Sequence, residues 1–538
     1  MIRVRQVKVK LNSSDELIRK SIANKLKINV NEIISFKINK QSIDARDKEN
    51  VHYICEYDVK LKNEEKVLRY KSNDILLTPD EKYIFNVTGN KELKHRPVIV
   101  GSGPAGLYAA YMLAKHGYRP LVIERGEQVE NRVETVKEFW NTGKLNKNSN
   151  VQFGEGGAGT FSDGKLNTLV KDSFNRNKKV LEIFYECGAP EEILYMNKPH
   201  IGTDLLVEVV KNLREKIISF GGEFRFNTCL TDLIITDGKL EGIIVNNSER
   251  IDTEVLVLAI GHSARETFRM LENKLDMSAK PFAVGVRVQH NQDMINVSQY
   301  GEKFAEMLPS ASYKLTYRTK EGRGVYTFCM CPGGFVVNSS SENNRLAING
   351  MSNFARDEKN ANSAVIVTIS PEDFGCKALD GLKYQEWLET LTYLKGNGNI
   401  PIQLLKDFKE NRKSEKFESV SPVMKGKFEF ANLREILPDY ITNSLIEAFE
   451  DFDKKIKGFG NGDSILAAIE SRTSSPIKIH RNEDGISSVE GIYPCGEGAG
   501  FAGGITSSAM DGLKIAECIA KKYKSFNWEN EYEIEVEV

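Results

Sequence analysis

The chain has 538 residues, enough for two to four domains with a large core. Hydrophobic residues make up 40% and charged residues 28%, as in ordinary soluble globular proteins, and a net charge of −1 provides no field for a polyanion. The start lacks an apolar signal region, and no segment is apolar enough to span a bilayer, so we expect no membrane association. Eight scattered cysteines favour a cytoplasmic protein, and the absence of H-x-x-x-H and C-x-x-C pairs predicts no metal site.

Residues 1–92 are predicted to form a small, separate α+β domain. Residues 2–11 alternate apolar and basic side chains, and the alternation slips at Gln6, as in a strand with a bulge. No motif in this domain can be tied to chemistry. The further elements expected here are a helix with Leu17, Ile18, Ile22 and Leu26 on one face, and strands at 51–62 and 66–70.

The charge pattern at the two ends of the chain carries two further expectations. The first fifty residues hold twelve Lys and Arg against six Asp and Glu, which is typical of a solvated basic face or of a nucleic-acid surface. Few aromatic residues interleave with these charges, which favours the solvated face and disfavours nucleic acid as a partner. The chain ends EYEIEVEV, and its alternating acids predict pairing with the basic first strand.

Residues 97–124 carry a dinucleotide-binding fingerprint. The apolar run 97–100 ends in Gly101, Gly103 and Gly106, and a helix is expected over 105–116. A second apolar strand, 120–123, then finishes in Glu124, where a carboxylate can accept hydrogen bonds from ribose hydroxyls. The same glycine spacing recurs at 154–159 and 498–503, but the context of a strand before and a helix after is clear only here. We therefore predict one βαβ site for a pyrophosphate and a ribose.

The rest of the chain predicts an interrupted α/β domain around a second sheet. The expected fold is a Rossmann-like nucleotide-binding domain (93–280, with an insertion at about 130–200), then a mixed, largely antiparallel substrate domain (281–485), and a return segment with a tail (486–538). The elements expected in the first part are a helix at 204–220, strands at 223–236 and 239–246 turning at Asp237-Gly238, and a buried parallel strand at 254–261. Those expected later are antiparallel strands around 281–290 and 322–331, helices at 384–395, 401–412, 441–457, 465–469 and 505–523, and a strand at 476–479.

A late motif indicates which dinucleotide binds. In 491–500, GIYPCGEGAG, a short strand leads to Gly496 and Glu497, and small residues and a helix follow. FAD needs a second contact for its ribityl chain and flavin, and a carboxylate can accept a ribityl hydroxyl. The helix N-terminus can face the edge of the flavin where negative charge develops on reduction. The pair of motifs therefore predicts FAD.

This arrangement resembles the glutathione-reductase-type FAD fold, and 257–262, VLAIGH, matches a third element of it. The stretches 153–166, 327–334, 470–479 and 493–512 are similar to a group of bacterial FAD-dependent dehydrogenases, an NAD(P)/FAD-dependent oxidoreductase family. The resemblance covers essentially the whole chain and implies FAD and redox chemistry, but no particular substrate. The cofactor-binding residues expected from these motifs are Gly101, Gly103, Pro104, Ala105, Gly106, Glu124, Arg125, Arg132, Gly157, Ala158, Gly159, Thr160, Leu230, Gly261, Gly496, Glu497, Gly504 and Ile505.

Several residues that are candidates for catalysis or ligand binding each allow two interpretations. The loop 153–166, with Lys165, either passes the flavin or substrate, which is favoured, or is a surface loop. Arg132 either pairs with a phosphate or is an exposed helix charge, and Arg472 either anchors an anionic or carbonyl substrate or is structural. His262 is either a proton donor or structural. Cys329 and Cys331 form either a redox pair or, as favoured, two buried small residues.

These observations predict a cytoplasmic FAD-dependent oxidoreductase that acts on a small molecule. The electron donor or acceptor is the substrate, NAD(P)H or a protein, and no second βαβ fingerprint for NAD(P)H is found. One alternative is a tRNA-modifying flavoenzyme, which the near-neutral charge disfavours. The other is a non-catalytic, redox-sensing flavoprotein.

Overall fold

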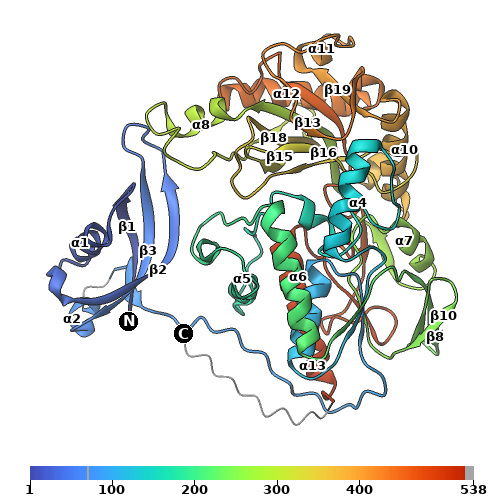
Figure 1. Ribbon diagram of the computed structural model, residues 1–538, viewed down its shortest axis with the longest axis horizontal. Helices are drawn as coiled ribbons and strands as arrows, with labels where there is room; N and C mark the ends of the chain where they lie inside the picture. Colours follow the sequence, from blue (N-terminus) through green and yellow to red (C-terminus); the bar gives the residue numbers. More distant parts are fainter. Residues whose placement is uncertain (70–71, 527–538) are drawn as a thin grey trace.

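The computed structural model describes residues 1–69 and 72–526, and its first unit is a four-stranded sheet packed against a long and a short helix (Figure 1). The strand order is β2-β3-β1-β4, and all neighbouring strands are antiparallel. The predicted bulge is confirmed, because the register of β1 shifts between Val4 and Val7 and Gln6 has a φ of 55°. The elements are β1 (Ile2–Lys10), α1 (Asp15–Leu26), a 3-10 turn (Val30–Glu32), β2 (Ile33–Asp44), β3 (His52–Leu61), α2 (Glu64–Leu68) and β4 (Ile75–Leu77).

One expectation for this unit is wrong, and another concerns residues that the structure does not describe. The strand predicted at 66–70 is wrong: residues 64–68 form the short helix α2, because the side chain of Asn63 accepts a hydrogen bond from Lys66 N and caps its start. Strand β2 was not expected, since its faces are half-buried and its sequence alternates only in part. The predicted pairing of residues 531–538 with the first strand lies outside the described residues.

The first unit lies beside the main body and is joined to it by residues 78–97, which form neither helix nor strand (Figure 1). Tyr83 and Phe85 of this segment pack against the core of the main body. Gln41 on β2 also exchanges two backbone hydrogen bonds with the main body: its N–H donates to Tyr195 O, and Asn197 N donates to its carbonyl, both at 2.8 Å. The hairpin of β2 and β3 is thereby fastened at a second point.

The main body is built on a five-stranded parallel sheet in the order β24-β11-β5-β6-β7. Its central strands are apolar on both faces because α3 and α13 cover one side and a second apolar cluster fills the other. This confirms the predicted Rossmann-like α/β domain. The elements are β5 (Val98–Val100), α3 (Pro104–Lys115), β6 (Leu121–Ile123), α6 (Thr203–Ser219), β7 (Glu223–Arg225), β11 (Leu256–Leu258), β24 (Ile492–Pro494) and α13 (Ile505–Lys522).

Two insertions decorate this sheet. Between β6 and β7 the chain forms a helical, glycine-rich excursion, and after β7 it forms an antiparallel sheet in the order β10-β9-β8. The predicted turn at Asp237-Gly238 is confirmed, because both residues have positive φ, 51° and 73°. The strand predicted at 223–236 is two strands in different sheets. The elements are α4 (Val129–Thr142), a 3-10 turn (Gly157–Phe161), α5 (Arg176–Glu186), a 3-10 turn (Glu191–Leu194), β8 (Leu230–Thr236), β9 (Lys239–Val245), β10 (Glu249–Asp252) and α7 (Arg265–Leu271).

A seven-stranded sheet, β14-β15-β18-β13-β22-β19-β21, forms the other half of the main body (Figure 1). Only β19 and β21 are parallel, which agrees with the predicted, largely antiparallel character. Its strands are β13 (Phe282–Asn291), β14 (Thr316–Arg318), β15 (Gly324–Cys331), β18 (Asn360–Ile369), β19 (Ile400–Leu404), β21 (Phe428–Phe430) and β22 (Ile465–Glu470). The accompanying elements are β12 (Met277–Ala279) with β23 (Ile477–Ile479), β16 (Phe335–Asn338), β17 (Ile348–Met351), β20 (Met424–Lys425), α8 (Gln292–Tyr300), α9 (Pro371–Phe374), α10 (Asp380–Lys395), α11 (Leu405–Lys409), a 3-10 turn (Leu433–Glu435) and α12 (Asp439–Lys455).

Two predicted helices of this half are strands wholly or in part. Residues 465–469 lie in β22, an inner strand buried on both faces, and a short apolar run of this kind has no periodicity that separates strand from helix. The helix predicted at 401–412 begins as β19 and becomes helical only at Leu405. The domain boundaries at 92, 280 and 485 stay predictions. Within residues 1–69 and 72–526, no helix combines the length and the apolar character needed to cross a membrane.

Candidate functional site

One cavity of about 920 Å³ brings the motifs of the sequence together. Its volume lies at the upper end of the range for ligand pockets, about 300–1,000 Å³. The two halves of the main body both contribute to its wall. The lining segments are the glycine turn 101–105, the end of β6 at 123–125, the loops 152–170 and 259–264, the strand β15 at 327–331 and the start of α13 with the preceding loop at 497–508.

The glycine turn fits a phosphate at the N-terminus of α3. Gly101 has a φ of 98°, and a Cβ added there would lie 2.6 Å from Ala259 O. A Cβ on Gly106 would lie 1.9 Å from Gly101 O, so Gly106 allows the helix to approach the turn. Gly103 caps the helix and Pro104 opens it, which leaves the first helical N–H groups free to face an anion.

Glu124 lies at the cavity with its carboxylate already engaged by the protein. Its Oε2 accepts hydrogen bonds from Ser102 N at 3.0 Å and Ser102 Oγ at 2.9 Å, and its Oε1 accepts from Gly126 N at 2.9 Å and Gly154 N at 3.1 Å. Glu124 therefore joins the glycine turn to the loop 152–165, a role that its position at a strand end does not reveal. Its contact with the ribose stays a prediction.

Arg132 has a role that differs from both predicted alternatives. The side chain is fully buried, so it is no exposed helix charge, and it does not line the cavity. Its guanidinium donates to the backbone carbonyls of Asn150, Val151, Gly154, Glu155 and Gly157, which shapes the glycine-rich loop. A signal was present in the sequence, because Arg132 shares one face of α4 with Val129, Val136 and Phe139.

The late motif is held by a buried ion pair. Asp511 on α13 accepts a hydrogen bond from Gly496 N at 2.8 Å and pairs with Arg481 at 2.6 Å. Glu497 points to the cavity and lies 3.2 Å from Nδ1 of His262, which also lines it. The Nε2 atom of His262 is buried and has no hydrogen-bond partner among the described residues. The segment 257–262 and the late motif 491–500, which were predicted separately, thus meet at the cavity through His262 and Glu497.

The lining residues fit FAD. A Cβ added to Gly261, in the loop after β11, or to Gly503 or Gly504, just before α13, would meet no atom within 4 Å, so the backbone at both places borders open space. The unpartnered His262 nitrogen provides a further polar group for a ligand. Of the predicted cofactor residues, only Gly106, Arg132, Thr160 and Gly496 do not line the cavity. Those that do are Gly101, Gly103, Pro104, Ala105, Glu124, Arg125, Gly157, Ala158, Gly159, Leu230, Gly261, Glu497, Gly504 and Ile505.

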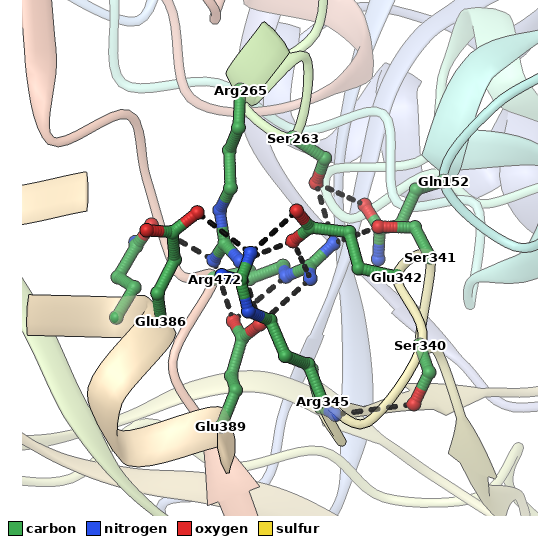
Figure 2. A network of polar contacts seen from close by, with 12 residues as sticks. Gln152, Ser263, Arg265, Ser340, Ser341, Glu342, Arg345, Glu386, Glu389 and Arg472 are labelled. Carbon is green, nitrogen blue, oxygen red and sulfur yellow. Dashed lines mark hydrogen bonds and ion pairs between the residues drawn. The ribbon is translucent and has the colours of Figure 1, made fainter. Parts of the chain in front are cut away.

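Arg472 is part of a buried charge network (Figure 2). Its guanidinium pairs with Glu389 on α10 at 2.8 Å and donates to Ser263 and Ser341. Arg265 on α7 pairs with the same carboxylate at 2.7 Å. Burial acts to raise the pKa of Glu389, yet the two guanidinium groups hold that pKa well below its usual range. This favours the structural alternative for Arg472, although the side chain still lines the cavity.

Lys165, a predicted catalytic candidate, also lines the cavity. Its ammonium pairs with Asp163 at 2.8 Å and donates to the carbonyl of Met330 on β15. Asp163 pairs as well with Arg356 from the other half of the main body. Burial acts to raise the pKa of Asp163, but Lys165 and Arg356 keep it below its ordinary value. The loop 152–165 is therefore bound to both halves. Asp163 lies in the predicted loop 153–166, whereas Arg356 was missed because its partner lies 193 residues away.

The cysteines of β15 are not arranged as a matched pair on one face. A bulge lies between Phe328 and Cys331, and Cys329 has a φ of 40°. Both cysteines line the cavity, but Cys329 is exposed and only Cys331 is buried, so the expectation of two buried residues is wrong for Cys329. The protein around Cys329 still disfavours its thiolate, and this desolvation raises the pKa of the thiol to about 12. Cys495 is buried beside Gly496. Neutral thiols of this kind act as small apolar residues.

Comparison with known proteins identifies the domains of the chain and its family. Residues 1–60 match a domain of unknown function, 99–155 an NAD(P)-binding Rossmann-like domain, and 281–473 an FAD-dependent protein, C-terminal domain-like. An uncharacterized protein of Clostridium beijerinckii is 48% identical over 530 residues, 97% of this chain and 99% of that protein. A thiamine thiazole synthase of Aeropyrum pernix is 23% identical over 228 residues, 40% of this chain and 71% of that protein.

Among solved structures, the glycine oxidase from Bacillus cereus is similar with a TM-score of 0.35 and 11% identity, over 80% of this chain and 99% of that one. The identity to the Clostridium protein extends over nearly all of both chains, and the matched domain at 281–473 is described by its dependence on FAD. The chain therefore belongs to the same family as the Clostridium beijerinckii protein, a family of FAD-dependent oxidoreductases, and its cofactor is FAD.

Proposed function

We propose that this protein passes hydride or electrons between FAD and a small organic molecule that enters the cavity from the half formed by residues 281–485. The observation that carries this proposal is the shared cavity: FAD-motif residues line it together with Cys329 on β15, Asn349 on β17 and Glu470 on β22. A substrate seated against these strands would therefore be next to the cofactor. When bound, FAD supplies hydride and one-electron transfer at N5 of its flavin ring.

The chain's own residues would hold and orient the two partners. Gly103 and the start of α3 would face the pyrophosphate, and Glu497 would accept a ribityl hydroxyl. His262 is our candidate for the group that exchanges a proton at the cavity, because Glu497 orients its Nδ1 and leaves Nε2 available. Arg472 would act by keeping Ser263 in position rather than by binding substrate.

The protein is expected to purify yellow, with non-covalent FAD rather than FMN. FMN would leave the glycine turn and Glu124 without a nucleotide half to bind. Heat release of the cofactor followed by chromatography identifies it. Recovery of FMN, or a well-folded preparation that neither contains nor takes up flavin, would show that the assignment of the two motifs is wrong.

NADH and NADPH are expected to reduce the flavin slowly or with poor affinity. The Rossmann-like match covers residues 99–155, the FAD fingerprint itself, and the 281–485 half is built on a largely antiparallel sheet. Among the described residues of that half, no parallel strand leads through a glycine turn into a helix. Anaerobic stopped-flow with each nucleotide, following flavin absorbance, measures the rate.

The same experiment tests the proposed function. After reduction by dithionite, reoxidation by dichlorophenolindophenol at roughly 1–10³ per second would show that an organic molecule reaches the flavin. A flavin that reacts with neither this acceptor nor menadione would contradict an oxidoreductase and favour a non-catalytic flavoprotein. Saturating reduction by NADH in the micromolar range at enzymatic rates would instead contradict only the claim about the nucleotide.

A further inference from the structure

Three lysines line the side of the cavity formed by residues 163–170, 198 and 312–331. Lys165, Lys198 and Lys314 are named here the cationic wall. The backbone holds Lys165 and Lys198 close together. Leu166 N donates a hydrogen bond to Pro199 O at 2.9 Å, and Lys165 forms an isolated antiparallel β-bridge with His200. Lys314 precedes β14 on the other half of the main body. The cationic wall thus spans both halves.

The acids on this side of the cavity are already neutralised. Asp163 is shared between Lys165 at 2.8 Å and Arg356, whose Nε lies 2.9 Å away. Glu470 is held by the buried Arg287 at 2.9 Å. Each carboxylate therefore has at least one cation of its own, and Asp163 has two, which leaves an excess of positive charge.

Lys198 and Lys314 add to the excess of positive charge on this side of the cavity. Lys198 donates only a long hydrogen bond, 3.5 Å, to Ser312 Oγ. Within residues 1–69 and 72–526, no carboxylate lies within 4.0 Å of either ammonium group. Lys198 is exposed, yet partial desolvation lowers the pKa of its ammonium group, and the nearby charges of Lys165 and Arg356 lower it further. An anion at this place would relieve the repulsion among these cations.

Apolar side chains stand at the same cavity without a core to pack on. Leu169 is 87% exposed and Val170 is 52% exposed, and both line the cavity next to the cationic wall. Phe174, four residues beyond Val170, is 61% exposed. A loop that presents several apolar side chains to water beside a ligand cavity is suited to cover the apolar part of a ligand.

We propose that the cationic wall binds the anionic group of an organic substrate whose apolar part lies against Leu169 and Val170. The inference rests on the proposed function and names its substrate class. Carboxylates and phosphates share the chemistry required, since lysine ammonium groups bind either as point charges. A neutral substrate of equal size would leave the cations unpaired.

Sodium octanoate and octanamide, which have the same length and differ in charge, provide the test. Isothermal titration of the FAD-loaded protein is expected to show octanoate binding about tenfold more tightly than octanamide. Octyl phosphate in place of octanoate separates a phosphate preference from a carboxylate preference, and tighter binding of either anion supports the proposal. The affinity for the anion should fall as sodium chloride is raised. Equal affinity for octanamide and both anions would overturn it.

Variants of Lys198 assign the effect to the cationic wall. Lys198→Gln should weaken octanoate binding about fivefold, and Lys198→Glu by more than about tenfold, with octanamide binding unchanged. Lys137→Gln on α4 is the matched control, because Lys137 is exposed and pairs with Glu134 away from the cavity. Unchanged octanoate binding in both Lys198 variants would overturn the proposal.

FAD content and dithionite reduction of the same samples separate this inference from the proposed function. A wild-type protein without reducible FAD would contradict the proposed function. Reducible FAD with no preference for an anion would contradict only the inference. If Lys198→Gln lost FAD while Lys137→Gln kept it, the cationic wall would serve the cofactor rather than a substrate, which would also overturn the inference.

Discussion

Replacing Glu389 by glutamine is expected to destabilise the protein by about 3–5 kcal/mol, because it removes the buried counter-charge that two buried guanidinium groups share. Glu389 is fully buried and accepts hydrogen bonds from Arg265, Arg472 and Ser471. The network of Figure 2 offers only one other carboxylate to both arginines, Glu342, and that side chain is partly exposed. Thermal unfolding followed by circular dichroism and by flavin fluorescence measures the loss and shows whether FAD is released first.

A matched substitution on the surface provides the control. Glu134→Gln removes the partner of Lys137 on α4, where both side chains are exposed, and should change stability by less than about 0.5 kcal/mol. If Glu389→Gln were as mild as Glu134→Gln, the buried network would contribute nothing to the fold. A larger melting shift in Glu389→Gln alone agrees with its buried position.

The effect of Glu389 should depend on pH in one direction. The folded pKa of this carboxyl is depressed, so the ionised group stabilises the protein above the unfolded pKa, about 4.3, and this stabilisation is lost as the pH falls below it. The difference between wild type and Glu389→Gln should therefore be constant above about pH 5 and shrink below about pH 4.3. A difference that grows with acidity would contradict the assignment.

Replacing Glu124 by alanine is expected to reduce FAD affinity by about 100-fold or more. The substitution removes the acceptor for three backbone N–H groups and the Ser102 hydroxyl, and each unsatisfied buried donor costs about 1–3 kcal/mol. The loss therefore exceeds that of one ribose contact, because the glycine turn and the loop 152–165 separate. Rebinding of FAD to the apoprotein, followed by flavin fluorescence, gives the dissociation constant.

Glu497→Ala is the comparison for this prediction. Glu497 is partly exposed and its carboxylate contacts only His262 in the described structure, so its removal should cost about tenfold in FAD affinity. Equal affinity for FAD in wild type and both variants would refute the roles given to the two acids. A loss in Glu497→Ala greater than in Glu124→Ala would refute the joining role of Glu124.

The parts of the site that can be predicted from sequence are those whose residues lie within one short segment of the chain. Gly101, Gly106 and Glu124 follow the strand–turn–helix–strand order of the chain, and local sterics require the two glycines at their places. The same holds for Gly496 and Glu497 before α13. The Rossmann-like fold of this half and its cofactor were accordingly predicted.

The charge networks could not be predicted in this way. Arg265 and Arg472 meet Glu389 from positions 124 and 83 residues away, and no local pattern distinguishes them from surface charges. Strand β22 was predicted as helix because five apolar residues buried on all sides suit either structure. In each case the deciding contact comes from a distant part of the chain.

The order of strands in the parallel sheet has a consequence for synthesis of the protein. Strand β11 pairs with β5 on one edge and with β24 on the other, although Leu258 and Ile492 are separated by about 230 residues. At about 5–20 residues per second, a ribosome would leave that edge of β11 unpaired for roughly 10–50 s. The nascent chain carries the whole fingerprint of residues 97–124 during this interval but cannot retain FAD through the late motif. Cofactor loading is thus tied to completion of the chain.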